Sequence, residues 1–177
     1  MLNLESMAIE LPAFVGHPNR EPFHGVLTLV DKPSDKAPAG SRGHRVILTR
    51  TAAERALPSL IGMALDYAPA FDRHDARRKV GVITRAEIVG KALELSGYLF
   101  AKDFPELVRQ IELGAIQASA AARRRPLNPL GMSCEIADAS VADVRAKIWT
   151  LTRVTFTGAA ILRRDKAAYH DTWIELD

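Results

Sequence analysis

Ser133 and His74 are the residues of this sequence whose types could together break an acyl bond. A serine hydroxyl is a weak nucleophile near neutral pH and needs a hydrogen-bonded base to take its proton. Imidazole, with an unperturbed pKa of about 6.5, suits that role. His74 precedes Ser133 by 59 positions, and Ser133 lies between Met132 and Cys134 without the G-x-S-x-G motif of α/β-hydrolases. The pair therefore predicts acyl transfer if the fold brings the two side chains together.

The other chemically capable residues are weak signals by themselves. The chain has five histidines, and a lone histidine is more often a structural or surface residue than a catalyst. Its single cysteine, Cys134, excludes an internal disulfide and a multi-cysteine zinc site built from this chain. No metal or organic cofactor is implied, because a serine and a histidine need only water for the second half of acyl transfer.

Four stretches between Pro22 and Tyr169 occur in a definite order. They are His74-Asp75 with Val80-Gly81, Leu95–Phe100 leading into a helix start at Asp103, Leu130–Ser133, and Leu151–Thr157 with Arg163-Arg164 beyond it. Their combination resembles the prohead maturation proteases of tailed phages and, more distantly, the assemblin proteases of herpesviruses. In that resemblance the first stretch corresponds to the histidine box and the third to the nucleophile box.

The resemblance implies a serine endopeptidase that cleaves scaffold and capsid proteins during phage head maturation, with Ser133 as nucleophile and His74 as general base. Arg163 and Arg164 match the paired arginines of the assemblin oxyanion loop, so they are candidates to stabilise the developing oxyanion. The implied partners are scaffold and major capsid proteins as substrates, with self-cleavage and homo-oligomerisation left open. The implied location is the cytoplasm of the bacterial host, within the assembling prohead.

The resemblance departs from the family at the residue that orients the base. Assemblins place a second histidine there and many phage relatives an acidic residue, whereas this sequence has Arg153. An arginine cannot orient a histidinium, so we expect Arg153 to point away from His74. The remaining candidates for the third member are Asp72, Asp75 and His170. A Ser-His dyad is one alternative, and a catalytically inactive assembly or scaffold-binding protein that retains the protease fold is another.

Composition limits the other function classes. The net charge is +3, and the basic runs Arg77–Lys79 and Arg123–Arg125 are typical of solvated faces. Only 6% of residues are aromatic, which disfavours a nucleic-acid module, although a basic binding module stays a weaker alternative. The first residues lack a basic signal-peptide region, and no apolar run approaches the roughly 20 residues that cross a bilayer. We therefore expect a soluble, cytoplasmic protein with no membrane partner.

Strands dominate the elements that would have to position these residues. Alternating patterns predict strands over Pro22–Val30, His44–Leu48, Val80–Ile83, Ala92–Phe100 and Lys147–Thr157. A capping box at Thr51–Glu54 predicts a helix that breaks at Pro58. A second helix should start over Asp103–Glu106 and end at Gly114, followed by an irregular loop over residues 115–130.

Clustered strands with few helices predict an α+β, mostly β fold. We expect a single-domain antiparallel β-barrel with peripheral helices, which the family resemblance makes assemblin-like. A chain of 177 residues fits one domain. We place a protease-like domain at residues 22–177, after an N-terminal segment at 1–21 that can be flexible.

Overall fold

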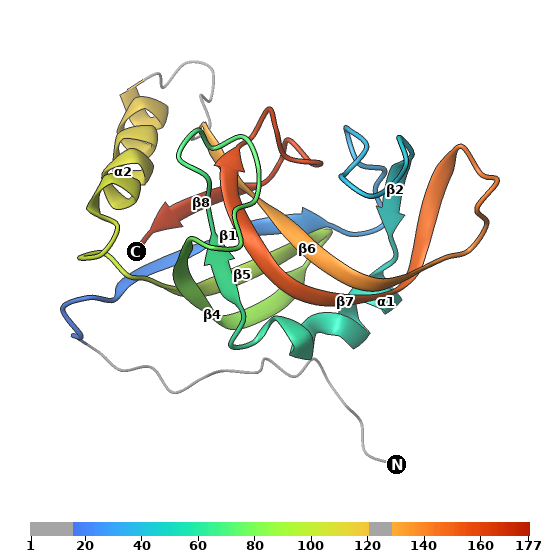
Figure 1. The fold of residues 1–177 in the computed structure, drawn as a ribbon, viewed down its shortest axis with the longest axis horizontal. Coiled ribbons are helices and arrows are strands. Elements are labelled where there is room, and N and C mark those ends of the chain that lie inside the picture. The colour runs from blue at the N-terminus through green and yellow to red at the C-terminus, as the bar shows by residue number, and fades with distance from the viewer. Residues whose placement is uncertain (1–15, 121–128) are drawn as a thin grey trace, which may run out of the picture.

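A computed structural model describes residues 16–120 and 129–177 (Figure 1). Strands contain 45% of the residues and helices 15%, which confirms the mostly β class. The strands are β1 (Glu21–Leu29), β2 (Arg45–Leu48), β3 (Ala64–Asp66), β4 (Lys79–Val89), β5 (Ala92–Leu99), β6 (Leu130–Val141), β7 (Ile148–Arg163) and β8 (Trp173–Leu176). The helices are α1 (Arg50–Ala56), the 3₁₀ helix η1 (Leu57–Leu60) and α2 (Pro105–Ala120).

The strands form one sheet organised around the long strand β7. One edge of β7 pairs with β6, and the other pairs with β2 near its start and with β3 near its end. The sheet continues from β3 through β4, β5 and β1 to β8. Most pairs are antiparallel, as in the expected antiparallel barrel, but the sheet departs from that expectation at β2 and β3, which both run parallel to β7. The chain travels along β7 from β2 through α1 and η1 to β3, so both short strands keep the direction of β7.

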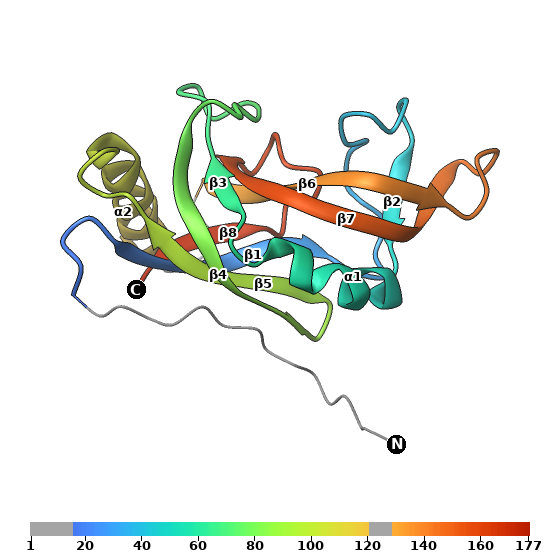
Figure 2. The same cartoon turned by 60° about the horizontal axis from the view of Figure 1, so that its bottom comes forward.

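The sheet curls into a half-barrel around the main core. Figures 1 and 2 show β6 and β7 lying opposite β1 and β5, with α2 at the end of the molecule far from α1 and β2. The largest fully buried side chains of the interior include Phe23, Leu65, Met132 and Phe156. Among the described strands, β6 pairs with β7 alone, so its second edge carries no strand. Near that edge, the Met132 amide donates a hydrogen bond to Thr172 Oγ1 at 3.3 Å.

The first helix differs slightly from its prediction. Thr49, two residues before the expected cap, accepts a hydrogen bond from the Ala52 amide and is the N-cap of α1. The predicted break at Pro58 is confirmed, because α1 ends at Ala56 and η1 follows. Proline removes one backbone donor, which is why the chain tightens into a 3₁₀ turn there.

The second helix is longer than predicted. Helix α2 runs through Gly114 to Ala120, so the expected end at Gly114 is wrong. Leu107 and Ile111 are fully buried against the core, and the residues after Gly114 include good helix formers, so packing and propensity outweigh the cost of one glycine. Residues 121–128, with the basic run Arg123–Arg125, lie outside the described residues, as does most of the expected N-terminal segment.

Helices of the described chain have no membrane-spanning character. None is long and apolar enough to cross a lipid bilayer.

Gly97 tests how closely the strands β1, β4 and β5 are packed. A Cβ atom on Gly97 would clash with the Val82 carbonyl oxygen and would lie 2.9 Å from Phe23 Cε1. Gly97→Ala should therefore lower the free energy of unfolding by about 1–3 kcal/mol, measured by urea denaturation. Ser96→Ala on the neighbouring position is the control and should change it by less than about 0.5 kcal/mol. Equal stability of Gly97→Ala and the wild type would contradict this packing.

Candidate functional site

Three residues of adjacent strands form a row on the face of the sheet away from the main core. In the register of the strands, Ser133 of β6 lies beside Ala160 of β7, and Ala160 lies beside Asp66 of β3. Directly paired residues project from the same face, and neighbouring strands are about 4.8 Å apart. Glu135 follows Ser133 by two positions on β6, so it too projects from this face. The row therefore brings a hydroxyl and two carboxylates onto one surface.

His74 reaches this surface from the connection between β3 and β4. This connection lies beside the end of β7 and the start of β6 in both ribbon views (Figures 1 and 2). His74 Nδ1 lies 3.1 Å from Glu135 Oε1, within hydrogen-bond distance, and 3.9 Å from Asp66 Oδ2. The imidazole is about one-third exposed. The ring thus lies between the carboxylates of two different strands.

The buried carboxylate of Asp66 helps to hold the β3–β4 connection in place. Its Oδ1 accepts a hydrogen bond from the Asp75 amide at 2.9 Å, next to His74 in sequence. Its Oδ2 is buried and makes no hydrogen bond with the described residues. Lys79 Nζ stands 3.5 Å from Oδ2, at ion-pair distance. Asp66 is completely buried, so the position of His74 depends on a charge inside the protein.

Small residues on β7 leave room for this arrangement. Gly158 lies beside Glu135 in the register, and a Cβ atom there would be 2.9 Å from Glu135 Oε2 and 3.2 Å from the Ala64 carbonyl oxygen. Ala160, between Ser133 and Asp66, is fully buried. A side chain at Gly158 would therefore meet Glu135 or the backbone of β3. The sequence of β7 is therefore matched to the cluster of His74, Asp66 and Glu135.

The contact with Glu135 determines the tautomer of a neutral His74. A carboxylate can only accept a hydrogen bond, so Nδ1 must carry the proton in that contact. In a neutral ring Nε2 then has a free lone pair and can accept a proton. This is the state that a general base requires, with Glu135 as the group that orients it.

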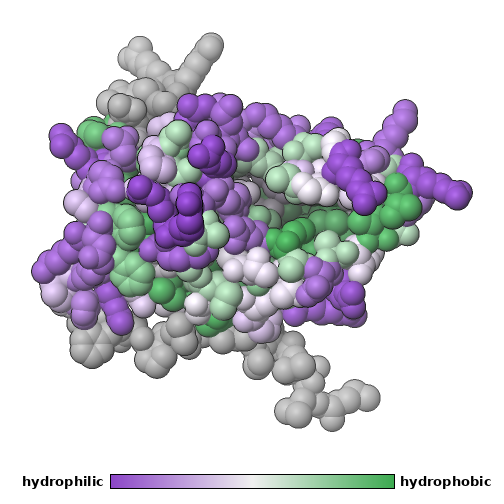
Figure 3. Space-filling model, in the orientation of Figure 1, coloured by the Kyte–Doolittle hydropathy of each residue, from purple (hydrophilic) through white to green (hydrophobic). Residues whose placement is uncertain are grey.

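Ser133 and His74 line one large cavity of about 1260 Å³. The cavity wraps around the unpaired edge of β6, with Ser133 and Glu135 on one side and the core-side residues Met132 and Cys134 on the other. Figure 3 shows apolar side chains gathered in the part of this face where β2 and the β6–β7 hairpin lie, with polar residues around them. Among the described residues, no hydrogen bond joins Ser133 Oγ to His74. The serine and the histidine thus share a cavity without being bonded in this state.

None of the three predicted orienting residues has a contact with the His74 ring among the described residues. Asp72 is exposed and lines the cavity. Asp75 Oδ1 accepts hydrogen bonds from the amide and the guanidinium of Arg77, and these contacts hold the pKa of the Asp75 carboxyl below its usual value. His170 is exposed. No contact of the described residues joins any of the three to the imidazole, which contacts Glu135 and Asp66.

The two oxyanion candidates have engaged backbone amides. The Arg163 amide donates to the Phe71 carbonyl, and the Arg164 amide donates to the Pro129 carbonyl, each with its oxygen 2.8–2.9 Å away. The Arg163 side chain bonds Asp165, and that of Arg164 bonds the His170 carbonyl. In this state both residues act as structural contacts at the end of β7.

Arg153 lies along β7 from the strand positions that flank the candidate base. It is exposed and lies beside Ser140 in the β6–β7 register, whereas the cluster lies near Gly158 and Ala160. Five to seven residues along a strand correspond to roughly 17–23 Å. The arginine at the position matched to the family's orienting residue therefore does not act on His74.

Asp66 and Glu135 are the residues of this cluster that the sequence analysis missed. Glu135 stands two positions after Ser133, and that spacing on a strand would have placed it on the same face. Residues 130–141 were not predicted as a strand, so this signal was not used. Asp66 ends a three-residue strand whose partner β7 is far away in sequence, and no local pattern marks it.

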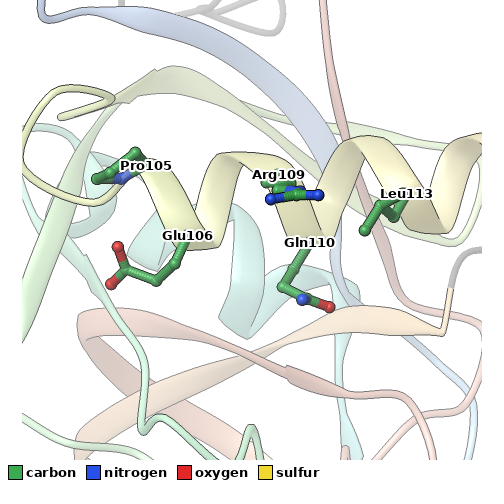
Figure 4. Close-up of a pocket in the computed structure, with 5 residues that line it drawn as sticks. All are labelled: Pro105, Glu106, Arg109, Gln110 and Leu113. Atoms are coloured by element: carbon green, nitrogen blue, oxygen red, sulfur yellow. The ribbon is translucent and has the colours of Figure 1, made fainter.

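A smaller hollow of about 550 Å³ lies along α2 (Figure 4). Its five lining residues all belong to one face of that helix: Pro105, Glu106, Arg109, Gln110 and Leu113. The Tyr67 hydroxyl donates a 2.6 Å hydrogen bond to Glu106, which lowers the pKa of that carboxyl. This carboxylate therefore has a structural contact.

No protein-family model matches the chain, and no curated protein matches it in sequence. The chemistry of the site must therefore be inferred from its geometry and from the four ordered stretches.

The reactivity of the Cys134 thiol tests whether Cys134, rather than its neighbour Ser133, could be the nucleophile on β6. Burial raises the pKa of its thiol to about 11, so little thiolate is present near neutral pH. Iodoacetamide at about pH 8 should alkylate the folded protein at least about tenfold more slowly than it alkylates glutathione, as followed by mass spectrometry. Unfolding in guanidinium chloride should remove this difference. Rapid alkylation of the folded protein would mean that Cys134 is an accessible, activated thiol.

Proposed function

We propose that the chain is a serine endopeptidase in which Ser133 is the nucleophile, His74 the general base and Glu135 the group that orients the base. The observation that carries this proposal is the 3.1 Å contact between His74 Nδ1 and Glu135 Oε1 in the cavity that Ser133 also lines. Ser133 and Glu135 lie about 7 Å apart along β6. An imidazole with a hydrogen bond at each nitrogen spans a similar distance, so the strand spacing suits a serine–histidine–glutamate relay.

The proposed reaction begins when His74 Nε2 accepts the Ser133 proton as Oγ attacks the substrate carbonyl carbon. Glu135 stabilises the imidazolium that results. His74 then passes the proton to the leaving amine, which leaves an acyl group on Ser133. A water molecule, activated by the same ring, releases this acyl group. Each step needs the Nδ1 proton to remain on the Glu135 side.

The unpaired edge of β6 suits an extended peptide. The Met132 amide donates to Thr172 and so points away from β7; by the alternation of an antiparallel ladder, the Cys134 amide points the same way. A peptide lying along this edge can pair with the backbone at Cys134, beyond the Met132 amide that Thr172 already occupies, while its side chains enter the apolar part of the cavity. The Cys134 amide also follows the nucleophile directly, a position that supplies an oxyanion donor in other hydrolases.

The biological setting of the proposal rests on the resemblance of the four ordered stretches. On that basis the proposed substrates are scaffold and capsid proteins cleaved during phage head maturation, on an assemblin-like fold. The competing function is an inactive assembly protein that keeps the fold. The missing hydrogen bond between Ser133 and His74 among the described residues is the observation that favours it.

A fluorophosphonate probe separates these two functions, because it labels activated serines. Wild-type protein should be labelled at Ser133, as identified by peptide mass spectrometry. Ser133→Ala should abolish labelling, and His74→Ala should slow it by at least about 100-fold. Ser140→Ala, on the same strand, is the matched control and should be labelled normally. If the folded wild type is not labelled, the protease proposal fails and the assembly protein is favoured.

The identity of the orienting residue can be tested by a substitution series. Glu135→Gln keeps the size of the side chain but lets its amide favour the wrong tautomer, so the labelling rate should fall by about 10²–10⁴-fold. Asp72→Asn, His170→Asn and Arg153→Ala should each change the rate by less than about threefold. Circular dichroism should show that all four variants are folded. A large loss in Asp72→Asn or His170→Asn with a normal rate in Glu135→Gln would reverse the assignment.

A further inference from the structure

We propose that Asp66, His74 and Glu135 form a binding site for a divalent transition-metal ion of the zinc class. The three residues offer one ligand atom each, and these atoms all lie within 4.8 Å of one another. They come from β3, from the β3–β4 connection and from β6, so the site exists only in the folded chain.

The distances are close to those of a metal site. Zinc binds imidazole nitrogen and carboxylate oxygen at about 2.0–2.2 Å, which puts tetrahedral ligand atoms roughly 3.3 Å apart. His74 Nδ1 is 3.1 Å from Glu135 Oε1 and 3.9 Å from Asp66 Oδ2. A shift of about half an ångström by the partly exposed His74 ring would close the longer of its two distances, and the partly exposed Glu135 side chain, whose oxygen lies within 4.8 Å of the Asp66 oxygen, would have to move toward Asp66 as well.

The buried oxygen of Asp66 is an independent observation that favours a bound cation, because its contacts with Lys79 and His74 are ion-pair contacts and not hydrogen bonds. Asp66 is fully buried, and its Oδ2 makes no hydrogen bond with the described residues, although it points toward His74 and Lys79. A buried carboxylate oxygen left without a hydrogen bond is costly. A cation between Asp66, His74 and Glu135 would satisfy it.

The charges and ligand types favour a transition metal over magnesium or calcium. Two carboxylates face one another across a histidine, and Lys79 is the nearby cation at 3.5 Å from Asp66. Lys79 is 41% exposed, so its ammonium can move into solvent when a metal takes its place. Imidazole suits zinc, cobalt and copper, whereas magnesium and calcium prefer oxygen ligands alone. Three protein ligands also leave a coordination position open for water.

Metal binding would switch off the base, a consequence that rests on the proposed function. A metal on Nδ1 displaces the proton that Glu135 holds there, and the neutral ring then carries its proton on Nε2. Nε2 can no longer accept the Ser133 proton. Zinc would therefore act as a reversible inhibitor that competes with Lys79 for Asp66 and takes Glu135 away from its orienting role.

Calorimetric titration of the full-length protein with zinc chloride tests the site directly. We expect one high-affinity ion per chain, and no comparable binding of magnesium. Glu135→Gln should weaken zinc binding by at least about tenfold, and Lys79→Met should strengthen it by removing the competing charge. His44→Asn, which changes a half-buried histidine outside the cluster, is the matched control and should bind normally. Binding that survives Glu135→Gln unchanged, or no stoichiometric binding, would overturn the proposal.

Two further measurements separate this site from the proposed protease. Cobalt should give the visible spectrum of a nitrogen- and oxygen-ligated ion, and His74→Ala should abolish that spectrum in a folded protein. Zinc should also block fluorophosphonate labelling of Ser133, with recovery on adding EDTA. If cobalt and zinc bind as expected but Ser133 is never labelled, the metal-site proposal is supported and the protease proposal is refuted. If labelling proceeds at a saturating zinc concentration, the inhibitory role is refuted.

Discussion

The candidate site depends on one buried charge. Asp66 ends the shortest strand of the sheet, beside β7, and is completely buried. Its two oxygens do different things: one fixes the Asp75 amide and with it the β3–β4 connection, while the other faces His74 and Lys79. A buried carboxylate destabilises the folded protein unless its surroundings compensate for the lost water. The connection that carries His74 is therefore ordered by the same contacts that make this burial tolerable.

Strand β7 is the strand against which Asp66 is placed. It pairs with β6 on one edge and with β3 on the other, so Ser133 and Asp66 lie on either side of it with one strand between them. Gly158 leaves room for the Glu135 carboxylate beside it, because a Cβ atom there would lie 2.9 Å from Glu135 Oε2. The main core lies on the opposite face, where Met132, Ala159 and Ile161 are fully buried. Stability and chemistry thus use alternate residues of the same two strands.

The sequence predicted those elements that leave a local pattern of residue types. Strict alternation located β1, β5 and most of β7, and Pro58 correctly marked the break after α1. The prediction that α2 ends at Gly114 was wrong, because the buried side chains of Leu107 and Ile111 and the helix formers after Gly114 keep the chain helical. The parallel pairing of β3 with β7 joins residues more than 90 positions apart, and no local signal encodes it. Since Asp66 and Glu135 meet His74 through that pairing, sequence patterns could name Ser133 and His74 but not the carboxylates around them.

The spacing of Ser133 and Glu135 on an edge strand ties the site to the alignment of β6 with β7. Side chains alternate between faces, so a slip of one residue would turn both groups toward the core and bring Met132 and Cys134 outward. Such a slip would remove Ser133 and Glu135 from the site together, so the site would be lost completely rather than partly. The full burial of Met132 opposes this slip, because a displaced register would expose a large apolar side chain. Met132, a core residue with no chemistry of its own, thereby stabilises the strand register on which the position of the nucleophile depends.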